Sequence, residues 1–268
     1  MIKLKTIEQA ENFSDKKFNK TFGVNKIVFA TMISVFQRQY EKSHKKGGRP
    51  PKVSIFERLC IFFAYYRDGR TIADIANEYS IAESTTFDII RLVEEALLLD
   101  ERFHLPSKRT LLKEDIDIAI VDATECSIQR PKKQRNYYSG KKKRHTLLVI
   151  SDDRIFCTNY AVHDFQLFKL SQLPLRQNTL VIADTGYLGI EKIHRKTLIP
   201  KKTSKLHRLT LEDKYYNRVI SKCRICIEHV IRKIKCFRIF SERYRSRHNT
   251  FKKRFNLVCA IFNFSLQI

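Results

Sequence analysis

The sequence predicts an α/β protein in which a small all-helical region precedes a mixed sheet flanked by helices. Apolar residues recur at helical spacing through the first 100 residues, and short apolar runs bounded by turn residues begin near residue 115. Helical spacing then returns after Thr210. With 268 residues, the chain can bury a substantial core in one large domain or two small ones.

The N-terminal segment, residues 1–43, carries two helical patterns. Apolar side chains form a stripe in the second pattern, at Ile27, Phe29, Met32, Val35 and Phe36. The next segment, residues 44–52 (HKKGGRPPK), combines glycine, proline and basic residues, which disfavour both a helix and a central strand. The sequence therefore predicts a basic linker here.

Residues 53–108 predict consecutive helices that include a candidate helix-turn-helix. A helix over about 54–68 precedes a second one with Ile72, Ile75, Ala76 and Tyr79 on one face. After a turn at residues 80–83, Ser84 is expected to begin a helix whose core face holds Phe87, Ile90, Val93 and Leu97. The start of the second helix meets base edges in such motifs, so its first-turn polar residues are candidate DNA contacts: Ser84, Thr85, Thr86 and Asp88. A plain helical hairpin is the alternative.

The second half of the chain predicts short strands. Four apolar runs are bounded by turn residues: DIAIVDATEC, HTLLVISDD, RIFCTNYAV and TLVIADTGY. Asp152-Asp153 is expected to form the tight turn of a hairpin. Short helices are predicted over 165–173 and 188–196, a last strand in TLIPKK, a long helix from Thr210 to about Tyr244, and a further helix over about 249–264.

The charge of the chain predicts a polyanionic partner. Lys and Arg number 52 against 28 Asp and Glu, a formal net charge of +24, which suits nucleic acid or an anionic membrane surface. No apolar run is long enough to span a membrane, and no apolar secretory signal is visible. The seven scattered cysteines suit reduced thiols, so a cytoplasmic location is expected.

Three carboxylates stand out because of the apolar sequence around them. Asp122 and Asp184 each lie inside an apolar run, where a buried charge is costly unless a cation neutralises it. Glu228 lies at the edge of an apolar stripe on the predicted long helix, formed by Ile225, Ile227, Val230, Ile231 and Ile234. Oxygen ligands alone favour Mg²⁺ or Mn²⁺. Two such ions about 4 Å apart can stabilise both the attacking and the leaving oxygen of phosphodiester cleavage. The alternative is that the three carboxylates are unrelated buried acids.

Seven segments occur in an order that carries a family resemblance. They are VDATECSIQRP, YYSGKKKRHTL, VHDFQLF, IADTGYLG, LIPKK, NRVISKCRICIEHVIRKIKCFRIF and RYR. With GRPPKVSIFERL upstream, they resemble the DDE transposases of bacterial insertion sequences, in the branch related to Harbinger-type nucleases, over about residues 48–268. The resemblance implies a DNA-binding helix-turn-helix domain over 53–108. It also implies a ribonuclease-H-like catalytic domain over 109–268, with Asp122, Asp184 and Glu228 as the metal-binding catalytic triad.

The same resemblance implies further DNA contacts. Arg224 and Lys235 flank Glu228 in an R-x₃-E-x₆-K signature, and this spacing places all three on one helical face, where the basic side chains can grip phosphates. Related transposases often carry a Tyr three residues before the Arg, whereas this chain has Ser221. The basic stretch over 130–145 includes Lys141, Lys142, Lys143 and Arg144, and is expected to lie on DNA, the alternative being a solvated loop.

Asp164 has two possible roles. It precedes a predicted helix, so its carboxylate either caps that helix or lies near the metal ions, behind their ligands.

The sequence thus predicts an insertion-sequence transposase that binds the terminal inverted repeats of double-stranded DNA, cleaves the ends and transfers strands. A homodimer or larger assembly on DNA in the bacterial cytoplasm, associated with the nucleoid when bound, is expected. The alternatives are a catalytically inactive or domesticated DNA-binding protein, and a host nuclease without strand joining. For residues 1–43, dimerisation and contact with DNA ends stay open.

Overall fold

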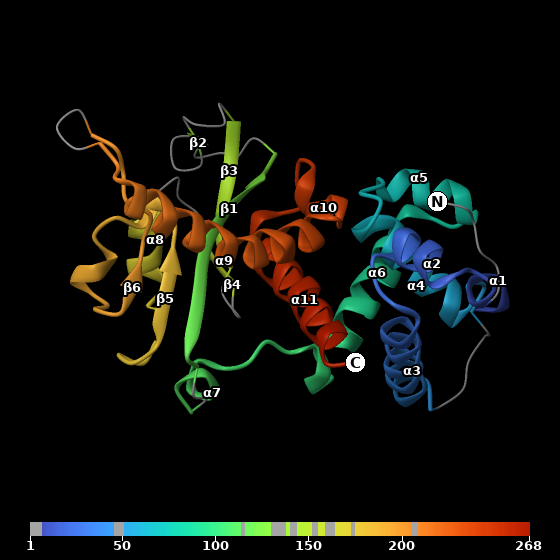
Figure 1. Ribbon diagram of the computed structural model, residues 1–268. Coiled ribbons are helices and arrows are strands. Elements are labelled where there is room, and N and C mark those ends of the chain that lie inside the picture. The colour runs from blue at the N-terminus through green and yellow to red at the C-terminus, as the bar shows by residue number, and fades with distance from the viewer. Residues whose placement is uncertain are drawn as a thin grey trace. The chain divides into compact units, whose positions relative to one another are not determined.

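The chain folds into two compact units (Figure 1). The computed structural model describes residues 7–45, 51–113, 116–129, 138–139, 144–151, 155–158, 164–172, 175–204 and 208–268. The helical unit comprises Met1–Leu105, Ile234–Arg243 and Asn249–Ile268, and the sheet unit comprises Pro106–Lys233 and Tyr244–His248.

The N-terminal segment forms three helices where the sequence predicted two. They are α1 (Ile7–Glu11), α2 (Asp15–Phe22) and α3 (Lys26–Ser43). The prediction missed the break before α2, where the Ser14 side chain accepts a hydrogen bond from the Lys17 amide and starts a new helix. Gly23 ends α2 in the left-handed conformation, with φ of 77°.

Aromatic side chains fill the core between α2, α3 and α4 (Ile55–Tyr66). The ring centroids of Phe22 and Phe29 lie 4.6 Å apart, and Phe63 stacks on Phe29 at 5.5 Å. Ile27, which the sequence placed in the same stripe, is instead 59% exposed. The buried stripe therefore begins at Val28, one residue later than predicted.

The two helices of the predicted helix-turn-helix are present as α5 (Ile72–Tyr79) and α6 (Glu83–Leu98). Ser80 takes the left-handed conformation, with φ of 53°, and the Ile81 amide donates to the Ala76 carbonyl, which closes the end of α5. These features join the two helices through the short turn that the sequence predicted.

Two predictions for α6 are wrong. Thr86 is fully buried and its hydroxyl donates to the Ala82 carbonyl, whereas Phe87 is 47% exposed. The helix begins at Glu83 rather than Ser84, and its buried face runs through Thr86, Ile90 and Val93. Thr86 is therefore excluded as a direct DNA contact.

The helical unit is completed by elements from the end of the chain, α10 (Arg238–Ser241) and α11 (His248–Leu266). Arg254 of α11 pairs with the buried Glu94 of α6 at 2.8 Å, and the Tyr66 hydroxyl donates to the same carboxylate at 2.9 Å. A short 3₁₀ turn, η1 (Glu101–Phe103), follows α6.

The sheet unit contains one mixed sheet. Its strands are β1 (Ile118–Ser127), β2 (Tyr138–Ser139), β3 (Arg144–Ser151), β4 (Ile155–Thr158), β5 (Leu180–Ala183) and β6 (Thr197–Leu198). The order is β2-β3-β1-β5-β6, with β4 also paired to β3. β3 is antiparallel to β1 and β4, as predicted, whereas β5 is parallel to β1 and β6 is parallel to β5. The predicted turn at Asp152-Asp153 lies outside the described residues.

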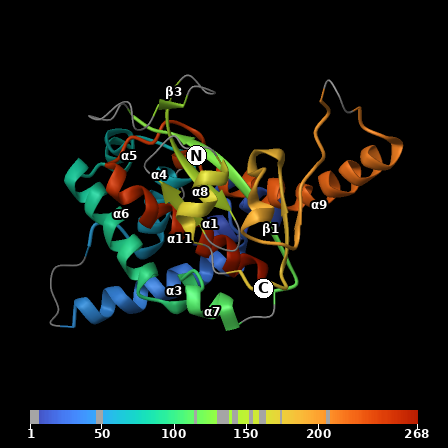
Figure 2. The ribbon, with the colours of Figure 1, turned by 90° about the vertical axis from the view of Figure 1, so that its left-hand side faces the viewer.

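Helices and 3₁₀ turns surround this sheet. They are α7 (Lys108–Lys113), α8 (Asp164–Ser171), η3 (Thr185–Tyr187), η4 (Ile190–Lys192) and α9 (Leu211–Lys235). α9 passes over β1 and β5 in Figure 1, and Figure 2 shows its start, with the segment before it, extending away from the strands. A core of Val121, Phe168, Val181, Ala183, Tyr187 and Ile190 lies between the strands and α8.

Two helix predictions in this half of the chain are wrong. Residues 188–196 form only η4, because Gly189 takes a φ of 100° and the buried His194 ring donates to the Thr179 carbonyl rather than continuing a helix. The predicted helix from Thr210 to Tyr244 ends at Lys235, and the buried Phe237 follows it. Ile225, predicted to pack inward, is 46% exposed.

Candidate active site

The register of two parallel strands brings Asp122 and Asp184 together. Val121 of β1 pairs with Ala183 of β5, and each aspartate is the next residue along its strand. Neighbouring strands of a sheet lie about 4.8 Å apart, so the two residues stand side by side where β5 ends. The apolar residues before each aspartate are buried in the sheet core, which fixes this register.

Arg224 of α9 links the two carboxylates. Its Nη2 lies 3.8 Å from Oδ1 of Asp122 and 4.0 Å from Oδ2 of Asp184. The side chains of Asp122 and Arg224 are 17% and 19% exposed, so water screens their attraction only in part. A residue distant in the sequence thus completes the cluster formed by the two strands.

The environment of Asp122 opposes ionisation. Burial raises the pKa of its carboxyl group above the usual value, and the negative charges of Asp184 and Asp164 act in the same direction. The charge of Arg224 and a hydrogen bond from the Ala123 amide at 2.9 Å partly offset this effect. Asp122 is therefore a carboxylate that a bound cation would stabilise.

Asp164, at the start of α8, lies at the same cluster. A Cβ atom built on Gly186 would be 2.6 Å from Oδ2 of Asp164 and 2.9 Å from Oδ1 of Asp184, so both carboxylates close over this glycine. The Gly186 amide donates to Asp184 Oδ1 at 2.7 Å, which orients the Asp184 carboxylate. Asp164 thus lies beside Asp184, a place compatible with its predicted position near metal ions.

Tyr187 lies beneath the cluster, and the sequence reasoning missed it. Its side chain is fully buried, and its hydroxyl has no hydrogen-bond partner among the described residues. Burial raises the pKa of this hydroxyl, and the nearby charges of Asp164, Asp122 and Asp184 raise it further. Its position three residues after Asp184, within the D-T-G-Y run, was the available signal.

The structure does not bring Glu228 into the cluster. Its side chain is exposed, and it makes no ion pair with a described residue. Ile220, Ile227 and Ile234 form the buried stripe of α9. Successive residues of an α-helix are rotated by about 100° around the helix axis. Glu228 therefore points about 40° further away from this stripe than Arg224 does. Across the described residues, no three His, Cys, Asp or Glu side chains are gathered closely enough to hold one metal ion.

The other residues predicted to contact DNA lie on several different elements. Ser84 and Thr85 are exposed at the start of α6, and Lys235 is partly buried at the end of α9. Arg144 is the first residue of β3, and its backbone pairs with Ser139. Lys141, Lys142 and Lys143 lie outside the described residues.

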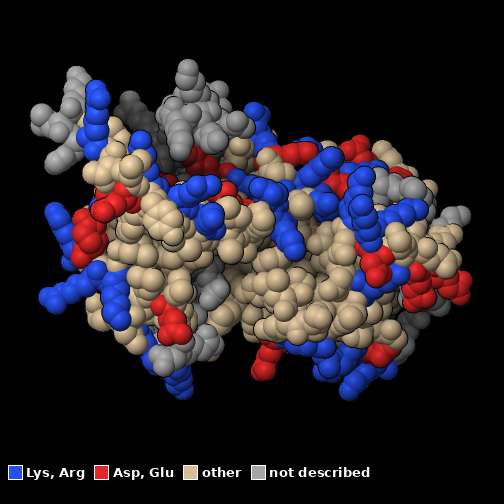
Figure 3. All heavy atoms as spheres, viewed as in Figure 1, with Lys and Arg blue, Asp and Glu red and all other residues tan. Residues whose placement is uncertain are grey.

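Basic side chains are widespread on the surface. Figure 3 shows Lys and Arg spread over the viewed face, with Asp and Glu among them. In the part of the chain that the structure describes, no helix is both long and apolar enough to cross a membrane.

Comparison with known proteins identifies similar sequences. Residues 121–263 match the family described as DDE superfamily endonuclease. The chain is 38% identical to the probable transposase for insertion sequence element IS702 of Microchaete diplosiphon over 273 residues, which cover 98% of this chain and 99% of that protein. No solved structure matches the chain significantly.

Proposed function

Because this chain belongs to the DDE superfamily of endonucleases, as a DNA-cleaving transposase of a bacterial insertion sequence, we propose that Asp122 and Asp184, with Glu228 as the third carboxylate that the family resemblance implies, hold its metal ions. Endonucleases of this superfamily generally use divalent metal ions. The finer proposal is that two Mg²⁺ or Mn²⁺ ions serve both cleavage of the element ends and strand transfer.

The meeting of Asp122 and Asp184 around Arg224 carries the proposal. Carboxylate oxygens are the ligands that Mg²⁺ prefers, and the half-buried position of Asp122 gives a cation a strong electrostatic advantage. The charge of Arg224 lies within 4.0 Å of both carboxylates and reduces their mutual repulsion. Asp164 lies beside Asp184, where its negative charge adds to the attraction for a cation.

When bound, such metal ions activate an attacking water or 3′-hydroxyl and neutralise the leaving oxygen. The residues of the chain would hold the metal ions and the DNA in place for the reaction. Asp122 and Asp184 are fixed by the strand register, and the Gly186 amide orients Asp184. Arg224 and Lys235 lie four residues before and seven after Glu228 on α9, and contact phosphates of the cleaved strand.

The arrangement of the strands supports a ribonuclease-H-like fold for the sheet unit, residues 106–233 and 244–248. Three consecutive antiparallel strands, β1, β3 and β4, are followed by β5 and β6, which run parallel to β1 on its other side. Asp122 lies on the central strand of this sheet.

DNA recognition is assigned to residues 53–108, which follow the N-terminal helical segment 1–43 and the linker 44–52. Within the helix-turn-helix α5–α6, Ser84 and Thr85 are exposed at the start of the second helix, where base edges are contacted in such motifs. This region binds the terminal inverted repeats, and two copies of the chain assemble on the paired ends.

Replacing Asp122 by Asn tests the catalytic assignment. The variant removes one ligand charge while keeping the shape of the side chain, so Mg²⁺-dependent cleavage of an element end is abolished while DNA binding is retained. Glu212→Gln is the matched control, because Glu212 is an exposed acid of the same unit and is expected to leave cleavage unchanged. Undiminished cleavage by the Asp122 variant would remove this residue from the mechanism.

Strand transfer needs a separate assay. Pre-cut ends with free 3′-hydroxyls, mixed with target DNA and Mg²⁺, are joined by a transposase. Cleavage of intact ends without joining of pre-cut ones would identify a nuclease that lacks transfer.

A further inference from the structure

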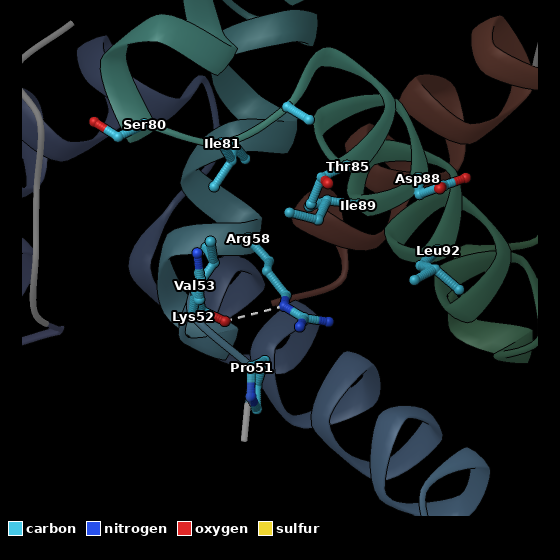
Figure 4. Close-up of a pocket in the computed structure, with 11 residues that line it drawn as sticks. Pro51, Lys52, Val53, Arg58, Ser80, Ile81, Thr85, Asp88, Ile89 and Leu92 are labelled. Atoms are coloured by element: carbon cyan, nitrogen blue, oxygen red, sulfur yellow. Dashed lines mark hydrogen bonds between the residues drawn. The ribbon is translucent and has the colours of Figure 1, made fainter. Parts of the chain in front are cut away.

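A pocket of about 670 Å³ lies in the helical unit, beside the turn between α5 and α6 (Figure 4). Its walls come from the residues that precede α4, from Arg58 of α4, and from the turn and first half of α6. Its volume falls within the range of about 300–1,000 Å³ typical of ligand pockets.

The feature that distinguishes this pocket is the buried guanidinium of Arg58. The residue is only 8% exposed, its Nε donates to the Val53 carbonyl at 3.1 Å, and its Cζ lies 4.6 Å from the Tyr40 ring centroid. In Figure 4 the side chain reaches between Pro51–Val53 and α6. Across the described residues, no carboxylate lies within 4 Å of it to form an ion pair.

A buried arginine without a counter-ion is energetically costly. The guanidinium stays charged at any pH that a protein survives, and its partial removal from water is unfavourable unless an anion compensates. Its planar fork of donors fits the oxygens of a phosphate with two parallel hydrogen bonds. Apolar residues such as Val53 and Leu92 line the pocket and reduce the solvent screening of that charge.

The remaining charges around the pocket keep it electropositive. Lys52 is exposed and lines it. The single carboxylate among the lining residues, that of Asp88, is exposed and lies 3.5 Å from Arg91. An anion that enters the pocket therefore meets Arg58 and Lys52, and Asp88, the acid among the lining residues, already has a partner.

We propose that the Arg58 pocket binds a backbone phosphate of the DNA on which α5–α6 docks. The proposal rests on the DNA-binding role of this helix-turn-helix. Thr85 lines the pocket and is exposed at the start of α6. When α6 lies in a groove of the DNA, the phosphates that border this groove therefore come close to the pocket. The apolar wall then covers the sugar attached to that phosphate.

The first test compares Arg58→Gln and Arg58→Lys with the wild-type chain, using fluorescence anisotropy of a labelled duplex from the DNA that flanks the gene. Loss of a charge-assisted contact weakens binding about tenfold or more. It also makes the slope of log K against log salt shallower by about 0.9. The lysine variant keeps the charge but not the fork, and binds with intermediate affinity.

Lys16→Gln is the control for net charge, because Lys16 is exposed on α2 and lies outside the pocket. An unrelated duplex is measured alongside, and Arg58→Gln weakens both DNAs to the same degree, since a phosphate carries no sequence information. Equal affinities and equal salt slopes for Arg58→Gln and the wild-type chain would overturn the proposal.

A second pair of variants leaves Arg58 in place, in case its loss unfolds the unit. Leu92→Glu offers Arg58 a carboxylate from the pocket wall, whereas Leu92→Gln has the same shape without the charge; Leu92 is 39% exposed and tolerates both. Leu92→Glu is expected to raise Tm above that of Leu92→Gln and to bind DNA about tenfold more weakly. Leu99→Glu, outside the pocket on the same helical unit, adds the same charge and retains binding. Identical binding by the two Leu92 variants would contradict the proposal.

The outcomes separate this inference from the function on which it rests. If the wild-type chain binds neither duplex, the helix-turn-helix assignment fails. If it binds both and the Arg58 and Leu92 variants match their controls, the pocket assignment alone fails. Inorganic phosphate is the third arm: an Arg58-dependent rise in Tm with phosphate, without any effect of Arg58 on DNA binding, would assign the pocket to a free anion and overturn the proposal.

Discussion

At Gly186, the site leaves no space for a side chain. A Cβ atom there would approach both Asp164 and Asp184 more closely than real Cβ contacts allow, at 2.6 and 2.9 Å. Gly186→Ala is therefore expected to displace the two carboxylates while the fold persists. Because a displacement of about 1 Å can cost roughly 100-fold in rate, cleavage should fall by that order. A cleavage rate within a few-fold of wild type, with DNA binding as the control for folding, would show that the carboxylates do not need this close approach.

Single residues of the site were predictable to different degrees. Asp122 and Asp184 could be identified because a carboxylate inside an apolar strand is unusual. The roles of Gly186 and Tyr187 depend on the conformation of a 3₁₀ turn, which carries no periodic signal. Glu228 and Arg224 lie four residues apart on one helix, so the sequence could place both near the site but could not say which one faces the carboxylates.

Among the elements, those with strong end signals were predicted best. α4 begins with a capping box between Ser54 and Glu57, and β1 and β5 are short apolar runs with clear boundaries. The error in α6 lies in its first turn, since Ile90 and Val93 are buried as predicted but Thr86 takes the core position that was assigned to Phe87. Residues 86 and 87 precede Ile90 by four and three positions, so both fit the helical spacing of the buried stripe and periodicity alone does not choose between them.

The ion cluster around Asp100 makes the stability of the fold depend on pH. Hydrogen bonds from Arg102, assisted by the charge of Arg38 on α3, hold the pKa of Asp100 at about 2. This pKa lies below the ordinary value for Asp, so the cluster stabilises the fold above about pH 4, and the stabilisation is lost as the pH falls towards 2. Asp100→Asn should lower the free energy of unfolding by about 1 kcal/mol at pH 7 and by less at pH 3. Urea unfolding measures both values, with Asp88→Asn as an exposed control; a difference independent of pH would refute the account.

Over the whole molecule, the path of the chain was the least predictable feature. The sequence assigned residues 109–268 to one domain by their motifs, yet α10 and α11 pack within the helical unit. α11 buries Phe251, Phe255, Leu257 and Val258 there. Burial of this kind depends on long-range packing partners, which helical periodicity within α11 does not identify.

Because the end of the chain packs with the N-terminal helices, we expect the two fragments of a chain cleaved near residue 106 to stay associated. A protease site inserted between Leu105 and Ser107 should yield fragments that co-elute in gel filtration, because α11 belongs to the same unit as the N-terminal helices. The double variant Phe255→Asp/Leu257→Asp should release the fragments, whereas Lys252→Asp on the exposed face should not. Separation of the unmutated fragments would instead support an independent domain over 109–268.

The central claim is that Asp122, Asp184 and Glu228 together hold the divalent ions, and direct measurement of Mn²⁺ binding tests it most closely. Electron paramagnetic resonance counts free Mn²⁺ in a titration of the chain bound to a DNA end, for the wild type and for Asp122→Asn, Asp184→Asn and Glu228→Gln, with Glu212→Gln as control. The account predicts about a tenfold or larger loss of affinity in each of the three variants and none in the control. Wild-type Mn²⁺ affinity in Glu228→Gln would remove Glu228 from the site, and wild-type affinity in all three would contradict the claim as a whole.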